Sequence, residues 1–162
     1  MYFWQRIWMP IYWFFYSLTL SKDEKNDFKK LTHALDTREK VMAWLFTNIK
    51  YTSDKHTWDE WQPAERTFER RAGDCEDWAV FANACLRTRV MGNYICMYTD
   101  TTGHCEYLID DGDFNWTTIG TYGLNRHHGT LAQIVPDWSG FENWTLAMIL
   151  DEDLNIVEVA GR

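Results

Sequence analysis

The stretch RAGDCEDWAVFA, residues 71–82, places a cysteine between two acidic residues at the start of a helix-forming run. Gly73 and Asp74 provide a turn and an N-cap, and Glu76 puts negative charge in the first helical turn, where the helix dipole favours it. The pattern predicts a helix that begins at Cys75. The N-terminus of a helix stabilises a thiolate, and its unpaired N–H groups suit the oxyanion formed when a carbonyl is attacked.

A base for this thiol is available about thirty residues further on, in the stretch GHCEYLID at residues 103–110. His104 stands at the head of a predicted strand, where an imidazole can be laid against a helix-borne thiol. Taken alone, a cysteine is usually a small buried hydrophobe and a histidine a hydrogen-bonded structural residue. Their joint placement favours a nucleophile and base pair, Cys75 with His104.

The arrangement of the expected elements, helices first and antiparallel strands after, predicts an α+β fold. Ser21 and Glu24 have the spacing of a capping box, and apolar residues at helical spacing predict a helix over residues 37–50. Alternation predicts strands over residues 93–100, 104–110 and 113–120, a loop over 121–129, and a strand or short helix over 144–153. Residues 131–140 fit no single element. Asp111-Gly112 is the preferred dipeptide of a type I′ hairpin.

Composition narrows the classes of function. The chain has 162 residues and no internal repeat or long linker, which fits one domain over residues 21–162 preceded by an aromatic arm over residues 1–20. The formal net charge of −8 argues against binding to nucleic acid. The four cysteines form no CxxC pair, so reduced thiols are expected.

The N-terminal arm, MYFWQRIWMPIYWFFYSLTL, is the most apolar part of the chain. Gln5, Arg6 and Pro10 interrupt it, whereas a membrane span needs about 20 apolar residues. An aromatic segment with an arginine can lie in a membrane interface, or it can pack on the domain or on a protein partner. Packing is the interpretation we prefer.

The segment YTSDKHTWDEWQPAERTFERRAGDCEDWA, residues 51–79, resembles the core of the bacterial transglutaminase-like cysteine proteinases. Trp61, Pro63 and Glu65 correspond to an aromatic loop and a Pro-x-Glu step, and the run from Gly73 to Ala79 corresponds to the family's cysteine motif. The resemblance covers roughly residues 51–121. It implies a papain-like fold in which a Cys-bearing helix packs on an antiparallel sheet that carries His and an acid.

The third catalytic residue is where the sequence departs from that family. The strand after the His strand usually carries Asp or Asn, and alignment on the hairpin places Thr117 there. With Asp111-Gly112 as the turn, His104 would face Ile119 and Thr117 would be its diagonal neighbour. Asn115 shares that face at a greater distance, and Thr118 would need a bulge.

Some members of the family bind Ca²⁺ through the acids beside the cysteine, so the resemblance makes Asp74 and Glu76 candidate ligands. Oxygen ligands suit calcium, but two carboxylates are few, and capping of the helix is the simpler role. No cofactor is required by the expected chemistry. A zinc site of Cys75, His104 and Cys105 is disfavoured because neighbouring strand residues point to opposite faces. The histidine pair at 127–128 is expected to be exposed in a loop.

Two functions remain open. The first is a thiol-dependent amide hydrolase, a cysteine peptidase, or an acyl transferase, in which Cys75 attacks, His104 acts as base and Thr117 orients the ring. The second is a non-catalytic binding or assembly module, such as a component of a phage virion, with the arm docked to a partner. The expected partners are a polypeptide substrate or a protein, with a membrane surface as an alternative for the arm. Trp58, Trp61, Trp78 and Trp116 are expected around the cleft, and Trp61 or Gln62 is a candidate for polarising a carbonyl.

Overall fold

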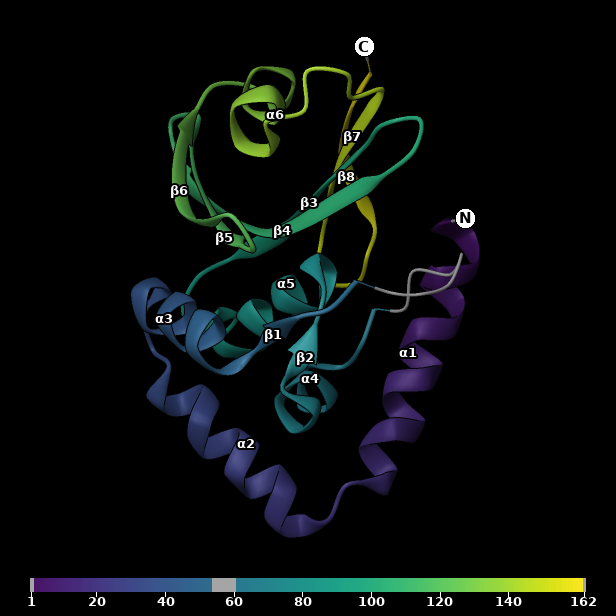
Figure 1. Ribbon diagram of the computed structural model, residues 1–162, viewed down its shortest axis with the longest axis vertical. Coiled ribbons are helices and arrows are strands. Elements are labelled where there is room, and N and C mark those ends of the chain that lie inside the picture. Colours follow the sequence, from purple (N-terminus) through teal and green to yellow (C-terminus); the bar gives the residue numbers. More distant parts are fainter. Residues whose placement is uncertain (1, 54–60, 162) are drawn as a thin grey trace.

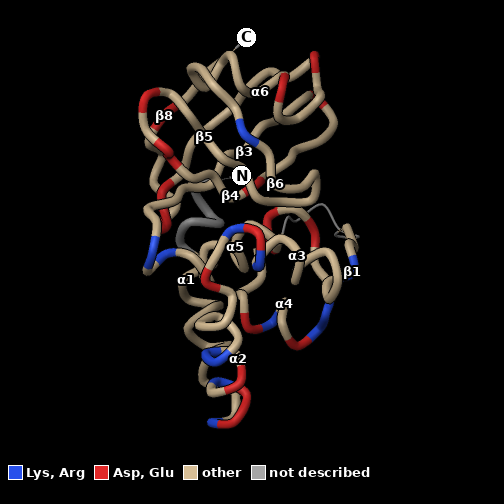
Figure 2. Tube along the Cα trace, turned by 90° about the vertical axis from the view of Figure 1, so that its left-hand side faces the viewer, with Lys and Arg blue, Asp and Glu red and all other residues tan. Residues whose placement is uncertain are grey.

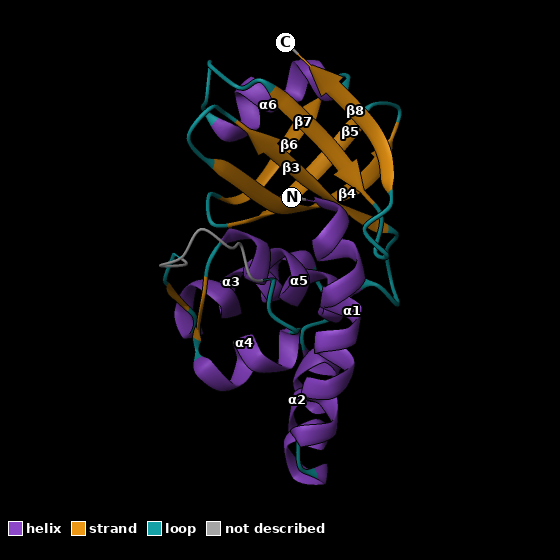
Figure 3. Ribbon diagram, turned by 90° about the vertical axis from the view of Figure 1, so that its right-hand side faces the viewer, coloured by secondary structure: helices purple, strands orange, loops and turns teal. Residues whose placement is uncertain are grey.

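A computed structural model of the protein describes the backbone of residues 2–53 and 61–161, with side chains from Trp8 onward. The helices are α1 (Tyr2–Thr19), α2 (Lys22–Ala34), α3 (Arg38–Asn48), α4 (Ala64–Arg70), α5 (Cys75–Leu86) and α6 (Leu131–Ser139). The strands are β1 (Lys50–Tyr51), β2 (Ala72–Gly73), β3 (Gly92–Tyr98), β4 (Gly103–Gly112), β5 (Asn115–Gly120), β6 (Gly123–His128), β7 (Leu146–Leu150) and β8 (Ile156–Gly161). Helices α1 to α5 form one half of the molecule, and the sheet with α6 forms the other (Figure 3). The predicted α+β class is confirmed.

The main sheet has six strands in the order β6-β5-β4-β3-β7-β8, and every neighbouring pair is antiparallel. Strand β4, which carries His104, therefore lies near the centre, paired with β3 on one side and β5 on the other. The first pairing aligns His104 with Met97, and the second aligns Tyr107 with Ile119. A separate pair of two-residue parallel strands, β1 and β2, lies among the helices (Figure 1).

Helix α5 lies between the sheet and the helices α2, α3 and α4 (Figure 1). All of its residues except Ala84 are buried, which accounts for a sequence that is apolar all round rather than on one face. Its aromatic neighbours stack closely: the rings of Trp44 and Phe81 are nearly parallel, with centroids 4.6 Å apart. A second buried cluster fills the opposite face of the sheet under α6. The sheet is therefore covered on both faces.

Local signals in the sequence account for the helix ends. Ser21 accepts the backbone N–H of Glu24 and Glu24 returns the bond, so the predicted capping box is confirmed at the start of α2. Thr37 caps α3, which confirms the helix predicted over residues 37–50. Helix α2 carries interspersed acidic and basic residues, visible as red and blue segments in Figure 2.

Four expectations for the C-terminal half are resolved by the structure. The loop expected over residues 121–129 is wrong, because β6 pairs with β5 there. The unassigned stretch at residues 131–140 contains α6, and the stretch at residues 144–153 contains the strand β7. The tight turn falls at Asp113 and Phe114, whose φ angles are 52° and 58°, and not at Asp111-Gly112. Two positive φ angles are the signature of a type I′ turn, so the turn type was right and its position was wrong.

The arm is the helix α1, which packs on the domain along one face. Met9 is buried, Trp13 donates its indole N–H to the carbonyl of Trp61 at 2.9 Å, and Arg66 bonds the hydroxyl of Tyr12. Among the described residues, none of the helices combines the length and the hydropathy that a membrane span requires. The other face of α1 exposes Trp8, Ile11, Phe14, Phe15 and Leu18.

Replacement of Phe81 by alanine should lower the free energy of unfolding by about 3–5 kcal/mol, because the cavity left between the sheet and the helices cannot collapse fully. Phe81 is wholly buried and touches both Trp44 and Phe28. Urea titration followed by tryptophan fluorescence measures the change. Met91→Ala, at a side chain that is 91% exposed, is the control and should leave the midpoint unchanged. A loss under 1 kcal/mol at Phe81 would contradict the packing described.

Alkaline pH should destabilise the fold through buried thiol and phenol groups. Burial raises the pKa of Cys85 from 9.0 to about 12 and that of Tyr107 from 10.0 to about 12. The folded state holds these protons where the unfolded chain releases them, so the stability present below pH 9 is lost as pH rises toward 12. Urea midpoints measured from pH 8 to pH 10.5 should fall steadily. Cys85→Ala should make that slope shallower, and a flat wild-type profile would contradict the assignment.

Candidate active site

The short ladder between β1 and β2 fixes the approach to Cys75. Lys50 pairs with Ala72 and Tyr51 pairs with Gly73, and the N–H of Thr52 donates to the carbonyl of Gly73 at 3.0 Å. The end of α3 is thereby held beside the residues that precede α5. Tyr51 comes to lie next to the helix N-terminus that carries the cysteine.

The buried carboxylate of Asp77 anchors the other side of this N-terminus. One oxygen accepts the backbone N–H of Gln62 at 2.7 Å, and the other accepts the Gln62 side-chain amide at 2.5 Å. The second oxygen also faces the N–H of Asp74 at 3.4 Å. A Cβ on Gly73 would sit 2.7 Å from the Cβ of Asp77, so only glycine allows this close approach.

Both polar atoms of the Gln62 side chain are engaged within the protein. Its amide nitrogen donates to Asp77, and Arg70 donates to its oxygen at 2.8 Å. Trp61 is buried against Tyr94, with ring centroids 5.3 Å apart, and its carbonyl accepts the indole of Trp13. Both residues build the wall of the site, and neither is placed to polarise a carbonyl.

The thiol of Cys75 lies at the first position of α5 and is 8% exposed. It donates to the Oε2 atom of Glu76 at 3.2 Å. Asp74 and Glu76 are themselves buried, at 5% and 3% exposure. The acids beside the cysteine are thus buried in the protein, and Glu76 is the hydrogen-bond acceptor of the thiol.

The imidazole of His104 is held by an acid that the sequence analysis did not select. The Nε2 atom of His104 lies 3.4 Å from the Oε1 atom of Glu106, and both side chains are buried. Glu106 is positioned in turn by two donors: the indole N–H of Trp138 at 2.7 Å and the backbone N–H of Tyr122 at 3.2 Å. The rings of Trp138 and Tyr122 also flank the imidazole, at centroid distances of 5.3 Å and 4.5 Å.

Glu106 was recognisable in principle from the period of a strand. Side chains two residues apart share a face, so the residue at position 106 had to lie beside His104 on β4. Glu106 is the one acid within the apolar part of this strand, whereas the resemblance points to the following strand for the partner of His104. Gly120 on β5 makes the room for this acid, because a Cβ there would meet the Cγ atom of Glu106 at 2.3 Å.

A cleft of about 480 Å³ opens next to His104; its lining is Phe46, Ile49, Tyr51, Trp78, His104, Thr121 and Tyr122. We call it the His104 cleft. Helix α5, which begins at Cys75, contributes Trp78 to its wall. The pKa of Tyr122 is raised chiefly by desolvation, and further by the charge of Glu106 and then that of Cys75. The pKa of Tyr51 is raised chiefly by burial, with Cys75 among the further causes. His104 lines this cleft, and the charge of Cys75 acts on two other residues of the lining, Tyr51 and Tyr122. The pairing of Cys75 with His104 stays a prediction.

The expected position of Thr117 beside His104 is wrong. The β4–β5 register pairs Ile109 with Thr117, three residues away from the register that the misplaced turn implied. Thr117 therefore lies on the face of the sheet opposite to His104. Its hydroxyl donates to Asp111 at 2.5 Å, and Arg38 donates to both Thr117 and Asp111. This ion pair ties α3 to the hairpin and lowers the pKa of Asp111.

The alternatives to Thr117 are also engaged elsewhere. Thr118 shares the face of His104, but its hydroxyl lies 3.2 Å from the Nε2 atom of His127. Asn115 lies in the hairpin and bonds the carbonyl of Gly112 at 3.0 Å. His127, expected in an exposed loop, is buried on β6 and also contacts Asp137 at 2.9 Å, which gives it a structural role.

The donor set does not fit calcium among the described residues. Asp74 caps α5 together with Asp77, and Glu76 accepts the thiol, whereas Ca²⁺ takes six to eight oxygen ligands. No group of three or more His, Cys, Asp or Glu side chains within residues 2–53 and 61–161 is arranged to hold a metal ion. Cys105 packs in the cluster on the α5 side of the sheet, away from the Trp138 side that holds His104.

The expected ring of tryptophans around the cleft is right in part. Trp78 lines the His104 cleft and meets Phe46 edge to face at 5.4 Å. Trp61 is buried behind it. Trp116 lies elsewhere, donating to the carbonyl of Gly129 and packing in the cluster under α6. Trp58 lies outside the described residues.

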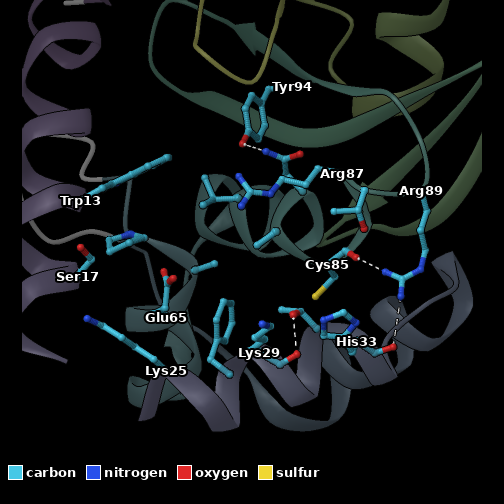
Figure 4. Close-up of a pocket in the computed structure, with 18 residues that line it drawn as sticks. Trp13, Ser17, Lys25, Lys29, His33, Glu65, Cys85, Arg87, Arg89 and Tyr94 are labelled. Atoms are coloured by element: carbon cyan, nitrogen blue, oxygen red, sulfur yellow. Dashed lines mark hydrogen bonds between the residues drawn. The ribbon is translucent and has the colours of Figure 1, made fainter. Parts of the chain in front are cut away.

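A larger hollow of about 550 Å³ lies between α1, α2, α4 and the C-terminal half of α5. In Figure 4, Trp13 and Ser17 line it from α1, and Lys25 and Lys29 line it from α2. Tyr94 of β3 lines it from the side of the sheet, at the top of the view. Neither Cys75 nor His104 belongs to its lining. The chemistry of the site is therefore concentrated in the smaller, aromatic cleft.

A cysteine at the N-terminus of a buried helix, packed on an antiparallel sheet that holds a histidine, defines a thiol-bearing α+β domain. The comparison with family models agrees: the model of the transglutaminase-like superfamily matches residues 24–108, just over half of the chain. The protein belongs to the transglutaminase-like superfamily. A search among curated proteins gives no significant match.

Replacement of Gly120 by alanine should displace Glu106, because the new Cβ would overlap its side chain. Overpacking of this kind costs about 1–3 kcal/mol. The indole N–H of Trp138, which donates to Glu106, should lose its protection from hydrogen exchange in NMR spectra. Gly161→Ala is the matched control, since its nearest neighbour would lie 3.9 Å from the new Cβ. Equal exchange of the Trp138 proton in both variants would contradict the fit of Glu106 against Gly120.

Proposed function

We propose that the protein is a thiol-dependent enzyme that acts on amide bonds of polypeptides, with Cys75 as nucleophile and His104 as general base. The observation that carries this proposal is the buried chain from His104 through Glu106 to Trp138, at a cleft that is also lined by Trp78 of the helix that begins at Cys75. Such a chain fixes an imidazole in one orientation.

The acid also determines which ring nitrogen acts. A carboxylate only accepts hydrogen bonds, so the Nε2 atom of His104 carries the proton that faces Glu106. The Nδ1 atom is then left with a lone pair, which suits a base. Protonation of the ring during catalysis would be stabilised by the same carboxylate. Glu106 thus takes the role for which the sequence suggested Thr117.

The reaction would begin when the Cys75 thiol leaves Glu76 and transfers its proton to His104. The thiolate attacks the carbonyl carbon, and the N–H groups at the start of α5 face the oxyanion. His104 then returns the proton to the leaving amine, and an acyl-enzyme remains. Water attacks it in hydrolysis, whereas a second amine attacks it in transfer.

The lining of the His104 cleft favours hydrolysis of a peptide segment with apolar side chains. Of the seven described residues that line it, four are aromatic, and His104 is the one ionisable side chain among them apart from the two tyrosines. Aromatic walls contribute contact area without selecting a charge. The acidic surface of the chain adds a weak preference for a substrate with basic residues at its ends.

The alternative is a non-catalytic binding or assembly module, which α1 favours. Trp8, Ile11, Phe15 and Leu18 repeat at helical spacing on its outer face and are each at least 42% exposed. The bond from the Cys75 thiol to Glu76 also keeps the thiol protonated in the state described. In this interpretation α1 docks on an apolar groove of a partner protein.

Alkylation of Cys75 by iodoacetamide between pH 6 and pH 8 should distinguish the two functions. A thiolate paired with His104 should react about 30-fold faster at pH 7 than an ordinary thiol of pKa ~8.5, and His104→Ala should lose that gain. Glu106→Gln should slow the reaction at neutral pH, while Thr117→Val should react like wild type. Peptide mass mapping locates the label.

Three assays on casein then identify the reaction. They measure release of new amino termini, release of ammonia, and incorporation of a fluorescent primary amine. Cys75→Ser is the inactive control. New amino termini that depend on Cys75, His104 and Glu106 would establish a peptidase. Slow alkylation of Cys75 in wild type and His104→Ala alike, with none of the three activities, would overturn the enzyme proposal and leave the binding module.

A further inference from the structure

Two cysteines that the proposed reaction does not use meet across the centre of the sheet. Cys96 on β3 and Cys105 on β4 are directly paired in the antiparallel register. Their sulfur atoms lie 3.0 Å apart. Residues directly opposite each other in such a pair have Cα atoms about 4.5–5.5 Å apart, inside the 4.4–6.8 Å that a disulfide spans. The bond can form without a change in the path of either strand.

The surroundings of the two cysteines limit which reagents can react with them. Cys96 is 1% exposed and Cys105 is 5% exposed, and both lie in the cluster beneath α5. Burial, followed by the neighbouring Cys96, raises the pKa of Cys105 well above its ordinary value. A thiol of this kind is rarely ionised in the folded protein, so bulky reagents react with it slowly. Oxidation is therefore expected while the chain folds, before the strands close.

We propose that Cys96 and Cys105 are a disulfide site, oxidised by a low-molecular-weight disulfide such as oxidised glutathione. The thiolate of one cysteine attacks the small disulfide and releases one molecule of its thiol. The thiolate of the other cysteine attacks the mixed disulfide, forms the Cys96–Cys105 bond and releases the second. Two protein thiols are oxidised, and one small disulfide is reduced to two thiols.

The bond would fix the register on which the site depends. Cys105 follows His104 directly, and the pairing of Cys96 with Cys105 neighbours that of Met97 with His104. A covalent link at this point holds the beginning of β4 against β3. Closing so short a hairpin should raise the unfolding temperature by about 5–10 °C. The link leaves the thiol of Cys75 unmodified, so it is compatible with either proposed function.

The test is to refold the reduced, denatured protein in a buffer of reduced and oxidised glutathione and then to block free thiols with N-ethylmaleimide in urea. Cleavage before Asp100 separates the two cysteines, so a disulfide appears as two linked peptides. We expect Cys96 linked to Cys105 as the main product, Cys75 and Cys85 labelled, and a higher unfolding temperature that dithiothreitol reverses.

The control variant is Cys85→Ser, which should form the same link, whereas Cys105→Ser should not. Recovery of wild-type Cys96 and Cys105 as free, labelled thiols would overturn the proposal, as would a main product that links Cys105 to Cys75. The measurement needs no catalytic activity. Its result therefore stands apart from that of the alkylation of Cys75.

Discussion

The site rests on the burial of one carboxylate, that of Asp77, in the first turn of α5. Asp77 is wholly shielded from solvent and binds the backbone and side chain of Gln62 while facing the N–H of Asp74. A buried acid is costly unless donors surround it, and this one has them from two separate segments. Because an unpaired Asp77 would be costly, the segment that carries Gln62 must approach the helix. The position of Cys75 follows, because it lies between the cap and the anchor.

The second constraint is the register of β4 against β5. A side chain on a strand changes face with every residue, so a shift of an odd number of residues carries it to the other side of the sheet. The turn at Asp113 and Phe114 produces such a shift relative to a turn at Asp111-Gly112. Thr117 is thereby moved to the Arg38 side, and Gly120 is brought opposite Glu106. The space that Gly120 leaves for Glu106 is a consequence of one turn.

The parts of the site that could be predicted are those that depend on local sequence. The residues Asp74, Cys75 and the apolar run after them define the start of α5 whatever surrounds it, so the position of Cys75 at the beginning of a helix could be predicted. The capping box at Ser21 is equally local. Glu106 could not be assigned in the same way, since its donors are Trp138 on α6 and the backbone of Tyr122, and nothing in the sequence brings these together. Strand β6 was missed because its polar, glycine-flanked sequence lacks the alternation typical of a half-buried strand.

Several acids are buried around the N-terminus of α5, and their cost in stability bears on the function of the site. Asp74, Glu76 and Asp77 follow each other around Cys75, and Glu106 adds a fourth carboxylate on the sheet, all at 5% exposure or less. Burying several like charges costs stability, since each loses hydration and repels the others. Asp77 offsets that cost through its bonds to Gln62, and the structure of the loop requires it. Glu106 accepts hydrogen bonds from the indole of Trp138 and the backbone of Tyr122, and it also faces His104. A carboxyl group buried in a sheet core beside an imidazole is an arrangement that functional sites often contain, and this is the physical ground for the role proposed for Glu106.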